Sequence, residues 1–161
     1  MKRCLFASIL LIVLVSSCVP TSTPTPAPAP ADAISPAVAT IDTFYQYIND
    51  AQSPNDLGKP WDMYTLEAMC NPRDYCDLTI FTDRWWSSKL NYRLYDCGNN
   101  RVIAEEMRYP RDNDSTVAPA KPQYWKYQLI EVEGRWMIDD TSARKSLDAE
   151  CMLVIDRSAN P

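Results

Sequence analysis

The stretch from residue 124 to residue 140, YWKYQLIEVEGRWMIDD, decides which fold this chain can adopt. Residues 123–133 are rich in aromatic and β-branched side chains, which favour strands. Glu133 and Gly134 follow and supply turn chemistry, because glycine accepts backbone conformations that other residues avoid. Residues 135–140 resume as a second strand. The stretch therefore predicts an antiparallel hairpin close to the end of the chain.

A second hairpin is predicted upstream of the first. Apolar and polar residues alternate from Leu90 to Tyr95, and a period of two is typical of a half-buried strand. Residues 97–100, Cys-Gly-Asn-Asn, provide a turn, and residues 101–109 read as the returning strand. Residues 110–122 are polar and hold three prolines, so they predict a long loop between the hairpins.

The part before the hairpins carries helical signals. Ser35-Pro36 is a good helix start, and apolar residues then recur at helical spacing up to Ser53-Pro54. A shorter helix is predicted from Lys59-Pro60 to Asn71-Pro72, and residues 77–85 favour a third helix or a strand. Helices that precede antiparallel strands predict an α+β domain over residues 35–161, with the helices covering one face of a curved antiparallel sheet.

The hairpin at residues 124–140 resembles the closing strands of the nuclear transport factor 2-like superfamily. The shared pattern is an aromatic-rich strand, an acidic-Gly turn and then Trp-x-Ile-Asp, here Trp136 to Asp139. The resemblance loosely covers residues 35–140 and implies a cone-shaped α+β fold that can leave an apolar cavity at its open end. The superfamily includes ketosteroid isomerase-like and polyketide cyclase-like enzymes and many non-catalytic lipoproteins and binding modules. The resemblance therefore implies a fold without fixing a function.

The N-terminal residues resemble an export signal. Met1-Lys2-Arg3 supplies positive charge, residues 5–15 are apolar, and Val15-Ser16-Ser17-Cys18 resembles the bacterial lipobox. The resemblance implies that residues 1–17 form a lipoprotein signal peptide and that Cys18 is acylated, which places the protein in the cell envelope, lipid-anchored and facing the extracytoplasmic side. A plain signal peptide with an incidental Cys18 and a retained membrane helix are the alternatives, and the apolar run is short for a membrane span.

Residues 18–34 form a Pro/Thr/Ala-rich tether with almost nothing to bury. Loss of Lys2 and Arg3 with the signal leaves 14 basic and 21 acidic side chains, a net charge of −7, which argues against a nucleic-acid partner. The chain contains no histidine, and this excludes a Ser-His-Asp triad and a His-ligated zinc.

Four cysteines remain in the expected domain: Cys70, Cys76, Cys97 and Cys151. An even number in an exported domain predicts two disulfides, for which three pairings exist. We favour Cys70–Cys76, which closes a short loop, and Cys97–Cys151, which ties the C-terminal tail to the first hairpin. The alternative of a four-thiolate metal site lacks the usual Cys-x-x-Cys pairs, so no metal and no cofactor is expected.

Aromatic residues could line a cavity for a small hydrophobic ligand, although aromatic residues more often only fill a core. The candidates are Trp61, Tyr64, Trp86, Tyr92, Tyr127 and Trp136. Asp and Tyr side chains could supply acid-base chemistry, but no spacing singles out a pair, so no catalytic residue is assigned. We expect a non-catalytic binding or interaction module of the bacterial cell envelope, whose partner is a small hydrophobic ligand or an envelope protein. The alternative is a small cone-fold isomerase, dehydratase or cyclase.

Overall fold

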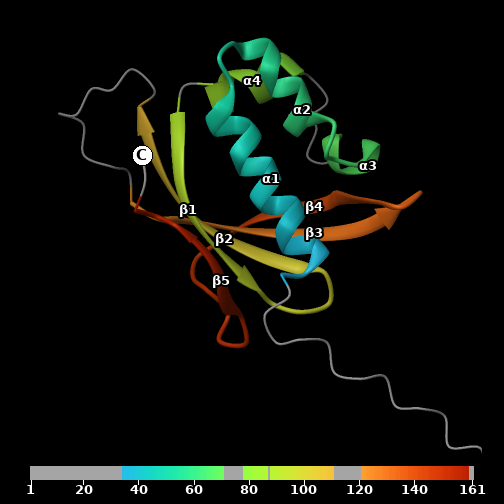
Figure 1. Ribbon diagram of the computed structural model, residues 1–161, viewed down its shortest axis with the longest axis vertical. Coiled ribbons are helices and arrows are strands. Elements are labelled where there is room, and N and C mark those ends of the chain that lie inside the picture. Colours follow the sequence, from blue (N-terminus) through green and yellow to red (C-terminus); the bar gives the residue numbers. More distant parts are fainter. Residues whose placement is uncertain (1–33, 71–77, 87, 111–120, 160–161) are drawn as a thin grey trace, which may run out of the picture. The chain divides into compact units, whose positions relative to one another are not determined.

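The computed structural model describes residues 34–70, 78–86, 88–110 and 121–159. They form an α+β fold of short helices and one five-stranded antiparallel sheet (Figure 1). The elements are α1 (Pro36–Asp50), η1 (Pro54–Leu57), α2 (Gly58–Trp61), α3 (Leu66–Met69), α4 (Leu78–Trp86), β1 (Ser88–Asp96), β2 (Arg101–Pro110), β3 (Gln123–Val132), β4 (Arg135–Arg144) and β5 (Met152–Arg157).

Helix α1 begins and packs as its sequence predicts. The Ser35 hydroxyl accepts a hydrogen bond from the amide of Val38, and Pro36 occupies the first helical position. Ser35 also donates to Asp96 at the end of β1, at 2.7 Å. The buried face of α1 comprises Ala37, Val38, Ile41, Asp42, Phe44, Tyr45 and Ile48. All of these except Asp42 and Tyr45 are purely apolar, so the helix is held to the sheet mainly by burial of hydrocarbon.

The helix predicted between residues 59 and 71 is interrupted. It divides into α2 and α3, because the backbone between them pairs with β4 instead of continuing helically. The amide of Thr65 donates to the carbonyl of Ile138, and the amide of Ile138 donates to the carbonyl of Met63. The stretch at residues 78–86, which favoured a helix or a strand, is the helix α4.

The strand order is β4-β3-β2-β1-β5, and every pairing between these strands is antiparallel. The β3–β4 turn consists of Glu133 and Gly134, both with positive φ, as a tight two-residue hairpin turn requires. Both predicted hairpins are therefore present. The C-terminal tail differs from the expectation, because residues 152–157 form a fifth strand that pairs with β1.

A disulfide joins Cys97, just after β1, to Cys151, just before β5, with the Cα atoms 4.2 Å apart. This confirms one of the two expected pairings. Strands β4 and β5 follow one another in the chain but occupy opposite edges of the sheet, so residues 145–151 cross its intervening strands. Cys76 and Cys18 lie outside the described residues, and the Cys70–Cys76 pairing stays a prediction.

Aromatic rings fill the space between α1 and the sheet. Phe44 packs edge-on against Tyr64 and Trp85, and Tyr45 stacks on Tyr92 with ring centroids 4.5 Å apart. In the described part of the chain, no helix is both long and apolar enough to cross a membrane.

Candidate ligand-binding site

A row of polar side chains crosses the helix-facing side of the sheet. Tyr92 of β1 lies opposite Glu106 of β2 on one side and Arg157 of β5 on the other. Residues directly opposite one another in an antiparallel sheet point to the same face, so all three side chains approach α1. Asp42 and Tyr45 of α1 meet this row.

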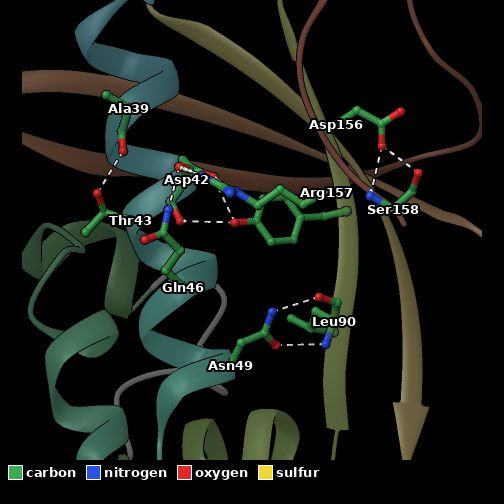
Figure 2. Close-up of polar contacts among 10 residues, drawn as sticks. Ala39, Asp42, Thr43, Gln46, Asn49, Leu90, Asp156, Arg157 and Ser158 are labelled. Atoms are coloured by element: carbon green, nitrogen blue, oxygen red, sulfur yellow. Dashed lines mark hydrogen bonds and ion pairs between the residues drawn. The ribbon is translucent and has the colours of Figure 1, made fainter. Parts of the chain in front are cut away.

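Asp42 is the centre of the first cluster, shown in Figure 2. Arg157 donates from Nε to Oδ1 and from Nη2 to Oδ2 of Asp42, both at 2.7 Å, which is a bidentate ion pair. The Tyr92 hydroxyl donates to Oδ1 at 2.8 Å, and Gln46 donates from its side-chain amide to Oδ2. Both carboxylate oxygens are thus satisfied from three different elements.

The contacts of Asp42 shift the pKa values of the groups involved. Partial burial by itself raises the pKa of Asp42, but hydrogen bonds from Arg157 and Tyr92 and the charge of Arg157 outweigh it, so the pKa lies below its ordinary value. Burial, together with the hydrogen bond to Asp42, raises the pKa of Tyr92. The hydrogen bonds to Asp42 also raise the pKa of Arg157. Asp42 and Arg157 are therefore charged, and Tyr92 neutral, at pH 7.

A pocket of about 400 Å³ opens beside this cluster. It lies between α1 and strands β1 and β5, and its lining residues are Gln46, Asn49, Asp50, Leu90, Tyr92, Asp156, Arg157 and Ala159. Asn49 joins the α1 wall of the pocket to the β1 wall. Its Nδ2 donates to the carbonyl of Leu90, and its Oδ1 accepts from the amide of Leu90, each at 2.8 Å (Figure 2).

A second cluster is centred on a carboxylate that is closed to solvent. Glu106 is 0% exposed; its Oε1 accepts from Nε and Nη2 of Arg108, and its Oε2 accepts from the Tyr45 hydroxyl at 3.0 Å. The hydroxyls of Tyr45 and Tyr127 are 2.9 Å apart, so with Tyr45 donating to Glu106, Tyr127 donates to Tyr45. Burial, followed by the charge of Glu106, raises the pKa of Tyr45 well above its ordinary value.

Two further hollows adjoin each other around α2, α3 and β4, because Asp62 and Arg135 line both. One, of about 500 Å³, is lined by Ala39, Thr40, Thr43, Tyr47, Lys59, Asp62, Met63, Arg135 and Trp136. The other, of about 480 Å³, is lined by Asp62, Tyr64, Thr65, Leu66, Met69, Val132, Arg135 and Met137. None of these three hollows is lined by Tyr45, Glu106 or Tyr127.

The aromatic residues expected to form one pocket lie in different places. Tyr92, Trp136 and Tyr64 each line a different one of the three hollows. Tyr127 is fully buried, and Trp61 and Trp86 are partly buried against the core. No single hollow among the three gathers more than one of the six.

The residues that make up the two polar clusters were not singled out from the sequence. Asp42 lies on the helical face that buries Ile41 and Tyr45. Glu106 lies on the same face of β2 as the buried residues Val102 and Ala104. A charged residue inside an apolar periodic face is a readable signal, because an isolated buried charge is costly. Arg157 carries no such signal, because its partner is 115 residues away in the chain.

Among the described residues, no group of three or more Cys, Asp or Glu side chains is arranged to hold a metal ion. No protein-family model, no curated protein and no solved structure matches this chain.

The lowered pKa of Asp42 predicts a pH-dependent contribution to stability. Because the folded-state pKa lies below the unfolded one, the contribution is complete above the ordinary carboxyl pKa and is lost as the pH falls through the folded value. Asp42→Asn is therefore expected to lower the free energy of unfolding by about 1–3 kcal/mol at pH 7, with the deficit shrinking toward pH 2.5. Urea unfolding across this range measures it.

The matched control is Asp62→Asn, which changes an exposed carboxylate and is expected to alter the unfolding free energy by less than about 0.5 kcal/mol at every pH. A deficit in Asp42→Asn that stays constant from pH 7 to pH 2.5 contradicts the role assigned to the Asp42 charge.

Proposed function

We propose that this protein is a lipid-anchored binding module of the bacterial cell envelope, facing the extracytoplasmic side and without catalytic activity of its own. Its domain is a nuclear transport factor 2-like cone, held on the membrane by Cys18 and a tether at residues 18–34. The partner is a small ligand or an envelope protein, and nucleic acid is not a partner.

One observation carries the choice of binding over catalysis. The acid-base groups of the Glu106 cluster, Glu106, Tyr45 and Tyr127, are 0% exposed, and each is hydrogen-bonded to another protein group. The Asp42 and Tyr92 pair beside the pocket is engaged as well, because Arg157 occupies both oxygens of Asp42 and the Tyr92 hydroxyl donates to Oδ1. A general acid or base must come within hydrogen-bonding distance of the substrate proton that it transfers. The pocket beside Asp42 and Arg157, in contrast, opens to solvent and offers polar groups at its wall.

The rival function is a small cone-fold isomerase, dehydratase or cyclase that acts through an Asp/Tyr or Glu/Tyr pair. A buried carboxylate beside two phenols, as in the Glu106 cluster, favours it. The Arg108 guanidinium on Oε1 and the Tyr45 hydroxyl on Oε2 disfavour it, because they already engage both carboxylate oxygens.

The anchor is tested by Cys18→Ser. Each buried methylene of an acyl chain contributes about 0.8 kcal/mol, so loss of the acylated sulfur is expected to release the protein from the membrane fraction. Globomycin is expected to block processing of the unmodified chain, and fractionation followed by mass spectrometry reads both results.

Cys4→Ser is the matched control, because it removes a cysteine inside the expected signal peptide and should leave processing and membrane attachment unchanged. Undiminished membrane association of Cys18→Ser refutes the anchor.

A further inference from the structure

The pocket between α1 and β1 has chemically different ends. Asp42, Gln46 and Asp50 are spaced four residues apart and therefore follow one face of α1. Asp42 holds Arg157 at one end, Asp50 lines the other, and Gln46 lies between them. Eight residues of helix at 1.5 Å per residue place Asp42, which holds Arg157, about 12 Å from Asp50 along the α1 axis.

Arg157, which lines the pocket, has N–H donors that Asp42 does not use. A guanidinium carries five N–H donors, and Asp42 takes the Nε and one Nη2 donor. Within the described part of the chain, Nη1 makes no hydrogen bond, and the side chain is 48% exposed. The ion pair with Asp42 fixes the orientation of the Arg157 guanidinium. The remaining donor edge of that guanidinium is therefore preorganised to bind a carboxylate.

The Asp50 end favours a positive group. Asp50 is exposed, and its carboxylate has neither an ion pair nor a hydrogen bond to any residue that the structure describes. It is the last residue of α1, whose final turn contains no basic residue, and the C-terminal end of a helix carries partial negative charge. An ammonium group would compensate both the Asp50 carboxylate and the partial negative charge of the helix end.

Asp156 does not compete with a bound carboxylate, although it lines the pocket. It lies opposite Arg93 in the β1–β5 register and is ion-paired with it at 3.1 Å, whereas the neighbouring Arg157 lies opposite Tyr92. Both Asp156 oxygens are already engaged, because Oδ2 accepts from Nε of Arg93 and Oδ1 accepts from the amide and the hydroxyl of Ser158.

We infer that this pocket binds a short zwitterionic peptide of about three residues, with its free carboxylate on the outer edge of Arg157 and its ammonium at Asp50. An extended chain spans about 3.3–3.6 Å per residue, so three residues cover about 10 Å and match the separation of the two ends. The Oε1 of Gln46, between the ends, accepts a peptide N–H. This inference rests on the proposed function as a binding module and names its ligand class.

Isothermal titration of the full chain with trialanine, trialanine amide, N-acetyl-trialanine and alanine tests the ligand class. Trialanine is expected to bind, and blocking either terminus is expected to weaken binding about tenfold, because each block removes a charge-assisted contact. Alanine, which is too short to reach both ends, is expected to bind at least tenfold more weakly than trialanine.

Two variants test which end of the pocket binds which terminus of the peptide. Arg157→Lys is expected to bind trialanine and its amide equally, because lysine lacks the second donor edge. Asp50→Asn, an exposed change that leaves the fold intact, is expected to bind trialanine and its N-acetyl form equally. Arg144→Lys and Asp62→Asn are the matched controls. Both should still bind trialanine about tenfold more tightly than its amide and its N-acetyl form.

Absence of trialanine binding overturns the inference, as does equal binding of all three tripeptide forms to the unmodified chain. Neither result bears on the anchor, because the Cys18→Ser release experiment reads membrane attachment independently.

Discussion

Arg108→Ala is expected to lower the free energy of unfolding by about 3–5 kcal/mol, because it leaves the Glu106 carboxylate buried without its cation. The Glu106 side chain is 0% exposed, so the carboxylate has no water contact in the folded protein and depends on its protein partners for charge compensation. Arg108 also lies over the Trp85 ring, 4.7 Å from its centroid, and the variant loses that contact as well. Equilibrium unfolding in urea, followed by tryptophan fluorescence, measures the change.

Arg93→Ala provides the matched control for Arg108→Ala. Arg93 is ion-paired with Asp156 and Glu105, but its side chain is 37% exposed, and ion pairs in water contribute about 0–1 kcal/mol. A loss below about 1 kcal/mol in Arg108→Ala, similar to that in Arg93→Ala, contradicts the view that the Glu106 cluster is a closed structural centre.

Replacing both Cys97 and Cys151 with serine is expected to cost about 4 kcal/mol of stability, the chain-entropy estimate for a loop of 54 residues. The double variant is chosen because a single replacement would leave the other cysteine of this bridge as an unpaired thiol. Thermal unfolding under non-reducing conditions measures the difference from the unmodified chain.

Dithiothreitol supplies the comparison, because it should bring the unmodified chain close to the double variant while changing the variant far less. A double variant that unfolds within about 1 kcal/mol of the unmodified chain contradicts a stabilising role for this bridge. Non-reducing peptide mapping in the same samples tests the Cys70–Cys76 pairing.

Local patterns predicted the elements whose stability is decided locally. The α1 helix follows from Ser35-Pro36 and the apolar spacing after it, and both hairpins follow from period-two alternation with turn residues. Local sequence patterns could not predict the interruption between α2 and α3, because it depends on backbone pairing with Ile138, more than seventy residues away. Strand β5 was missed for the same reason, since its partner β1 lies across the Cys97–Cys151 loop.

The candidate site was less predictable than the fold. Aromatic content pointed to six residues, but the packing of α1 on the sheet uses Tyr127 as core and separates Tyr92 from Trp136. The groups that shape the pocket are Asp42, Gln46, Asp50 and Arg157, and their importance comes from spatial pairing between the first helix and the last strand. The sequence did contain one signal for this site. Asp42 is a charged residue within the otherwise apolar periodic face of α1, and this predicts a partner for its charge.

The hydrogen bond from Ser35 to Asp96 bears on how the tether proposed above would load the domain. Under that proposal, a pull along the tether would reach the described part of the domain near Ser35, whose hydroxyl is hydrogen-bonded to Asp96, the residue before Cys97. At this point the Cys97–Cys151 disulfide joins the end of β1 covalently to the start of β5. A pull on the proposed tether would therefore be opposed there by a covalent bond as well as by the pairing of β1 with β5.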